Sequence, residues 1–82
     1  MKKDRKYYRL TVKRYPLYYP INEAYLFEED VYAYSDIGAQ NSFYRYHANS
    51  YGGHLIVSTA EISKEEFRGH HYTHVLEENK NG

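Results

Sequence analysis

The chain has 82 residues, no cysteine, and 11 basic against 11 acidic side chains. The lack of cysteine excludes disulfides, thiolate metal sites and cysteine nucleophiles. A formal net charge of zero argues against a protein that coats nucleic acid by bulk charge. The longest apolar run, residues 55–57, is too short to cross a bilayer, so a cytoplasmic location is expected. We expect one domain over residues 1–82, with flexible ends at 1–5 and 78–82.

The first predicted element is a strand at residues 7–13, where apolar and polar side chains alternate. Its buried face would carry Tyr8, Leu10 and Val12. Two prolines then predict a loop over residues 15–23, because proline lacks the N–H that a strand donates to its neighbour.

Residues 24–34 predict a second strand with a bulge or an exposed middle, because three consecutive acids interrupt its aromatic and β-branched residues. The charges are unevenly distributed. Residues 1–14 carry seven basic and one acidic side chain, whereas residues 15–44 carry five acidic and no basic ones. One interpretation pairs the basic strand with the acidic strand, so that opposite charges neutralise each other across the sheet.

A turn at residues 36–41 and a third strand at 42–48 are expected next. Residues 49–53, which end in two glycines, predict a hairpin turn. The second arm of this hairpin would be residues 54–60, with Leu55 and Val57 on one face and Ile56 on the other.

The strongest helix signal begins at Ser63. Ser63 and Glu66 have the spacing of a capping box, and apolar residues flank them as in a hydrophobic staple. One alternative continues this helix through the histidine-rich run. The preferred alternative ends it at Arg68 with Gly69 as a left-handed cap, followed by a strand that begins near Tyr72.

These elements predict an α+β fold dominated by β-structure. It would be a small antiparallel sheet of four to five strands with one short helix starting near Lys64, and a small SH3-like barrel is the alternative.

Three of the five histidines lie between residues 70 and 74. His70 and His74 would share a stripe with Glu66 in a helix, or one face of a strand, and in either case they are candidate metal ligands. Further ligands, such as His47 or His54, would have to come from elsewhere. The simpler interpretation is a set of surface histidines, and no cofactor is expected.

No phosphate-binding loop, nucleophile elbow or metalloprotease helix occurs, so a binding protein is expected rather than an enzyme. A small metal-independent ribonuclease built from His, Tyr, Arg and Lys needs no tight motif and is the third hypothesis. Available acid or base candidates are His54, His71, Asp36 and Glu61.

Twelve tyrosines are too many for so small a core, because each buried hydroxyl needs a hydrogen-bond partner. The leading hypothesis is a non-catalytic protein-binding module, such as a phage or mobile-element inhibitor of a host nuclease or defence enzyme. Homodimerisation could complete its core. The expected protein-binding residues lie in or beside the predicted loops and turns: Tyr15, Tyr18, Tyr19, Tyr44, Tyr46 and Tyr51.

The alternative function is nucleic-acid or nucleotide binding through the N-terminal strand. Its cations would contact phosphates and its tyrosines would stack on bases. The residues expected to do so are Arg5, Lys6, Tyr7, Arg9, Lys13 and Arg14.

Overall fold

The computed structural model describes residues 4–16, 23–50 and 52–76. Four strands form one antiparallel sheet in the order β3-β1-β2-β4. The elements, in chain order, are β1 (Lys6–Tyr15), β2 (Tyr25–Ala33), α1 (Asp36–Tyr46), β3 (Gly53–Ile62) and β4 (Tyr72–Val75). This confirms the prediction of a β-dominated α+β fold with an antiparallel sheet and one short helix. Within the described residues β3 and β4 are edge strands of an open sheet, so the SH3-like barrel alternative was wrong.

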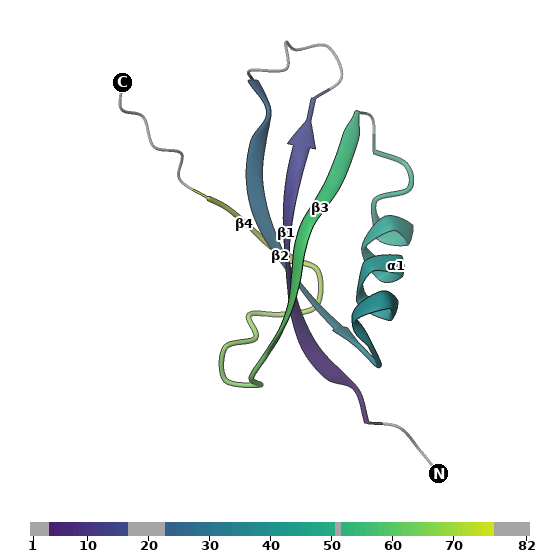
Figure 1. Ribbon diagram of the computed structural model, residues 1–82, viewed down its shortest axis with the longest axis vertical. Helices are drawn as coiled ribbons and strands as arrows, with labels where there is room; N and C mark the ends of the chain where they lie inside the picture. Colours follow the sequence, from purple (N-terminus) through teal and green to yellow (C-terminus); the bar gives the residue numbers. More distant parts are fainter. Residues whose placement is uncertain (1–3, 17–22, 51, 77–82) are drawn as a thin grey trace.

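The central strand β1 has the alternation that the sequence predicts. Tyr8, Leu10 and Val12 are buried on one face of the sheet, where they form a core with Ala39 and Phe43 of α1. The helix therefore covers this face and runs alongside the sheet (Figure 1). Each large apolar side chain that is fully buried in this way stabilises the fold by roughly 1.5–3 kcal/mol.

The helix lies where a turn and a third strand were expected, and that expectation was wrong. Ser35 has extended backbone geometry, and its Oγ accepts a hydrogen bond from the backbone N–H of Gly38. A Cβ at position 38 would lie 3.2 Å from that oxygen, so glycine suits the cap. Ala39 and Phe43, four positions apart, are both fully buried. A cap and an apolar pair at helical spacing override the local strand propensity of the aromatic residues.

The predicted helix near Lys64 is only a turn, so the expected position of the helix was also wrong. The capping box itself is formed, because Glu66 N–H donates to Ser63 Oγ and Ser63 N–H donates to Glu66 Oε1. The chain leaves the helical path directly afterwards. Arg68 donates its backbone N–H to Asp30, and Gly69 follows with a φ of 142°. A tertiary contact thus ends the helix after its first turn, and the strand expected after Gly69 is formed as β4.

The acidic middle of β2 is neither bulged against β1 nor exposed, which corrects the expectation for residues 24–34. The pairing of β1 with β2 is regular from Lys6 to Arg14, and Glu29 and Asp30 are fully buried. They lie on opposite faces of the sheet, because successive residues of a strand point to opposite sides. As one interpretation of the charge pattern predicted, Arg9 lies opposite Asp30 and forms an ion pair with it.

The expected hairpin of residues 42–48 and 54–60 is not formed. The chain runs from α1 into β3, and β3 pairs with β1 instead. The register shifts between Thr11 and Val12, so the irregularity of this sheet lies in the β1–β3 pairing. Leu55 and Val57 are half exposed, whereas Ile56 packs against the core.

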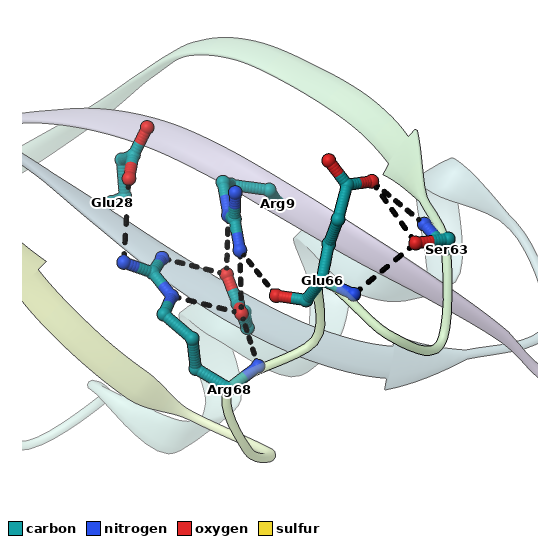
Figure 2. A network of polar contacts seen from close by, with 6 residues as sticks. Arg9, Glu28, Ser63, Glu66 and Arg68 are labelled. Carbon is teal, nitrogen blue, oxygen red and sulfur yellow. Dashed lines mark hydrogen bonds and ion pairs between the residues drawn. The ribbon is translucent and has the colours of Figure 1, made fainter.

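The segment between β3 and β4 connects opposite edges of the sheet and crosses the face away from α1. There Phe67 packs on the rings of Tyr7 and Tyr32, which stack on each other. From this side the guanidinium groups of Arg9 and Arg68, labelled in Figure 2, both donate hydrogen bonds to the carboxylate of Asp30. The two faces of the sheet therefore have different covers, a helix on one and an irregular segment on the other.

Candidate functional site: a histidine-lined pocket

A pocket of about 220 Å³ lies at the end of the sheet where α1 terminates. All four strands and the segment after α1 contribute to its wall. The lining residues are Arg14, Tyr25, Phe27, His47, Ser50, His54, Thr73 and Val75. Pockets that enclose a whole drug-sized ligand are usually larger. This one suits a single group of a larger molecule.

His47, directly after α1, is held by the buried carboxylate of Glu29. Nε2 of His47 lies 2.7 Å from Oε1 of Glu29. Because an ionised carboxylate only accepts hydrogen bonds, the histidine donates here. Nδ1 is the ring nitrogen that this contact does not use. Glu29 thus fixes the orientation of a ring that lines the pocket.

The second oxygen of Glu29 binds His71, which directly precedes β4. Nδ1 of His71 lies 2.6 Å from Oε2 of Glu29, and Nε2 lies 3.3 Å from Oγ of Ser42. In neutral His71, Nδ1 donates to the carboxylate and Nε2 accepts from the serine hydroxyl. The ring of Tyr46 stacks on His71 at 3.9 Å. Glu29 therefore joins the helix side of the pocket to the start of β4.

His54, near the start of β3, is the second histidine of the pocket. Its ring centroid lies 5.1 Å from that of His47. Burial lowers the pKa of His54 below the ordinary value of 6.5, and the positive charges of Arg14 and His47 lower it further, against an opposing effect of Glu29. His54 is therefore neutral at pH 7 and has a lone pair that can accept a proton.

The remaining wall combines one cation with aromatic faces. Arg14 pairs with Tyr25 on one side and His54 on the other, so these three residues share a face of the sheet. Tyr25 and Phe27 lie with ring centroids 6.3 Å apart. No acidic side chain is among the described lining residues, since Glu29 lies behind His47. A lining of this composition favours an anion that carries a flat, apolar group.

Asp30, the other buried acid of β2, belongs to a separate network on the opposite face. It accepts hydrogen bonds from the guanidinium groups of Arg9 and Arg68 and from the backbone N–H of Arg68. Burial raises the pKa of Asp30, but the hydrogen bonds from Arg68 and Arg9 outweigh burial, so the pKa lies well below its usual range. Arg9 also donates to the carbonyl oxygen of Glu66. These contacts, drawn in Figure 2, attach the β3–β4 segment to the sheet.

Of the six residues expected to bind nucleic acid, only Arg14 lines the pocket. Arg9 is engaged by Asp30. The guanidinium of Arg5 lies over the rings of Tyr32 and Tyr34, near the other end of β1. Tyr7 packs against Phe67. Lys6 is exposed, and Lys13 lies over the ring of Tyr15.

The tyrosines expected to bind a protein partner are placed in different surroundings. Tyr44 and Tyr46 of α1 are both exposed, but residues two positions apart point about 200° away from each other around a helix. Tyr15 is partly buried at the end of β1. Tyr18, Tyr19 and Tyr51 lie outside the described residues, as does most of the predicted loop over 15–23. A tyrosine-rich binding surface stays a prediction.

The histidines expected to bind metal have separate environments. Nδ1 of His70 accepts a hydrogen bond from the backbone N–H of Tyr32. His74 of β4 lies opposite Glu28 of β2. In the described part of the chain, no group of three His, Asp or Glu side chains is arranged to hold a metal ion. The pocket instead is lined by His47 and His54. The sequence suggested both only as further metal ligands, and His54 also as an acid or base candidate.

No protein-family model matches the chain, and neither the curated proteins nor the solved structures include a significant match. The one helix in the described ranges lacks the length and apolar character needed to cross a membrane.

Proposed function

We propose that this protein binds a phosphate-bearing ligand of the nucleotide class, either a free nucleotide or the exposed nucleotide of a single-stranded RNA. The observation that supports this is the common lining of one pocket by Arg14, two histidines and two aromatic rings. It takes up the nucleic-acid alternative drawn from the sequence, but it places binding in the pocket instead of along the whole N-terminal strand.

Each part of the wall has a role in this proposal. Arg14 supplies the permanent positive charge that a phosphate requires, and a guanidinium can bind two phosphate oxygens at once. Tyr25 and Phe27 supply π-faces on which a base can stack, a contact worth about 1–3 kcal/mol per base. The pocket volume of about 220 Å³ fits the recognition of one nucleotide unit better than the recognition of a longer segment.

Binding is tested with a fluorescently labelled single-stranded RNA and with unlabelled nucleoside monophosphates as competitors. We expect the affinity for the RNA to fall as salt rises, because phosphate binding releases counterions. Arg14→Ala should weaken binding about tenfold or more, since a hydrogen-bonded charge contact is worth about 1.5–3 kcal/mol.

Lys6→Ala is the matched control, because it removes one positive charge from the other end of the same strand. It should leave the affinity within about twofold of wild type. An equal loss in both variants would mean diffuse binding along β1 and would contradict the pocket. The absence of binding at low salt would reject the proposed function altogether.

The inhibitor hypothesis and the choice of a protein partner stay predictions.

A further inference from the structure

The two pocket histidines differ in their electrostatic surroundings although their rings are 5.1 Å apart. His54 comes from β3 and His47 from the end of α1, so the fold brings them together from separate elements. Both line the pocket. A phosphoryl group bound in the pocket would lie beside both rings, because both line its wall.

The charges near the two rings assign them opposite tasks. His54 faces Arg14 and His47, and with burial these charges keep it neutral. His47 is bound by the buried carboxylate of Glu29 at 2.7 Å, an acceptor that holds this ring as a hydrogen-bond donor. In enzymes, two titratable groups with different environments can act as base and acid at the same pH.

We infer that the pocket cleaves RNA by acid–base catalysis, with His54 as the base and His47 as the acid. This inference rests on the proposed function, since it requires that the phosphate of an RNA lies in the pocket. It adds a reaction and restricts the substrate to nucleic acid that has a 2′-hydroxyl group.

The reaction is an internal transfer in which no external reactant is consumed. His54 accepts the proton of the 2′-hydroxyl while the 2′-oxygen forms a bond to phosphorus. The bond between phosphorus and the 5′-oxygen of the next nucleotide breaks, and His47 donates a proton to that oxygen. The products are a 2′,3′-cyclic phosphate and a free 5′-hydroxyl. Arg14 stabilises the negative charge on the phosphoryl oxygens in the transition state.

Glu29 acts as a positioning residue in this scheme. It holds the His47 ring by one nitrogen. Its other oxygen is held by His71, which in turn contacts Ser42. A carboxylate fixed at both oxygens keeps the acid in one orientation, as catalysis by positioned groups requires.

The test uses a DNA oligonucleotide that contains a single ribonucleotide and a dye at each end. The buffer contains a chelator, and products are analysed by mass spectrometry. We expect cleavage only after the ribonucleotide, with the cyclic phosphate as the first product. His54→Gln and His47→Gln should each lower the cleavage rate about 100-fold or more, the usual contribution of a general base or acid. The rate should also fall on the acidic side as His54 becomes protonated.

His74→Gln is the control variant, since His74 is an exposed residue of β4 opposite Glu28 and outside the pocket. It should cleave at the wild-type rate, and circular dichroism should show that all three variants are folded. Cleavage that persists in both pocket variants, or cleavage of the all-deoxy oligonucleotide, would overturn the inference. So would a wild-type protein that binds the oligonucleotide without cleaving it, although the proposed function would then stand. Binding is measured with the same oligonucleotide carrying a 2′-O-methyl group in place of the 2′-hydroxyl, which cannot be cleaved, and a protein that does not bind it would reject both.

Discussion

His47 donates a hydrogen bond of 2.7 Å to Glu29, a carboxylate that is fully shielded from solvent. A buried charge of this kind is costly unless it is hydrogen-bonded. Here the cost is offset because His71 binds the other oxygen at 2.6 Å. The contact therefore serves the fold as well as the pocket, and this dual role can be separated by measurement.

Glu29→Gln is expected to destabilise the protein by about 1.5–3 kcal/mol. Both histidines lose a charged acceptor, and one of them then faces the amide N–H group of the glutamine instead of an oxygen. Urea unfolding monitored by tyrosine fluorescence provides the measurement. Glu28→Gln is the matched control on the next residue of β2. It removes an ion pair with Arg68 that is only partly buried, and should cost less than about 1 kcal/mol. Equal effects of the two changes would show that the buried bridge contributes little.

Asp30→Asn is expected to cost about 3 kcal/mol, because it leaves Arg9 and Arg68 facing a neutral group in a mostly buried place. The irregular segment between β3 and β4 should loosen, since Arg68 attaches it to Asp30 through both backbone and side chain. Faster hydrogen exchange at the amide of Arg68 would show this directly. Glu65→Gln, an exposed change in the same segment, should alter neither quantity. Unchanged exchange at Arg68 in Asp30→Asn would contradict the attachment.

Ser35→Ala should lower helix content and cost about 1 kcal/mol, because it removes the hydrogen bond that caps α1. Ser63→Ala removes a similar serine from a capping box that is followed by a single turn. It should leave the helical circular dichroism signal unchanged. A loss of helicity in Ser63→Ala, or none in Ser35→Ala, would mean that the helix lies where the capping box suggested.

Stability should fall as the pH drops below about 6.5. Burial lowers the pKa of His54, and the nearby charges of Arg14 and His47 lower it further. Burial also lowers the pKa of His70, where His71 and Arg5 add to the effect. Below the unfolded value of 6.5 the unfolded chain therefore binds more protons than the folded one, which favours unfolding.

The check is the urea midpoint of unfolding at about pH 7.5 and about pH 5.5. The wild-type midpoint should be lower at the acidic pH, and a His54→Gln, His70→Gln double variant should show a smaller difference. Ser50→Ala is the control, because serine does not titrate in this pH range. It should show the same difference between the two midpoints as the wild type. A midpoint that rises on acidification would reverse the assigned sign.

The strand β1 and the strand after Gly69 could be predicted because their signals are local, an alternation of side chains and a glycine stop. The helix could not be placed by the same reasoning. Phe43 and its aromatic neighbours have strand propensity, and only the buried spacing of Ala39 and Phe43 reveals a helix. The capping box at Ser63 is real but short, because Asp30, distant in sequence, captures Arg68. Tertiary contacts decided both outcomes.

The pocket was beyond local prediction for a different reason. Arg14, His47 and His54 come from separate parts of the chain, and no spacing in the sequence indicates that they meet. One interpretation of the charge pattern did predict that β1 pairs with β2, and Arg9 takes part in that pairing through its ion pair with Asp30. What remained hidden was which of five histidines would face a cavity. Only the folded arrangement shows that these are His47 and His54.

Because the wall of the pocket is assembled from all four strands and the end of α1, no short peptide of this chain can reproduce it. Truncation mapping, which locates linear binding motifs well, would therefore return a misleading answer, with every deletion inactive. Point substitutions in the intact chain are the suitable tool. Loss of the ligand site and loss of the native fold should then occur at the same denaturant concentration, so a ligand that binds the pocket should raise the unfolding midpoint, by an amount that grows with the logarithm of its concentration above Kd.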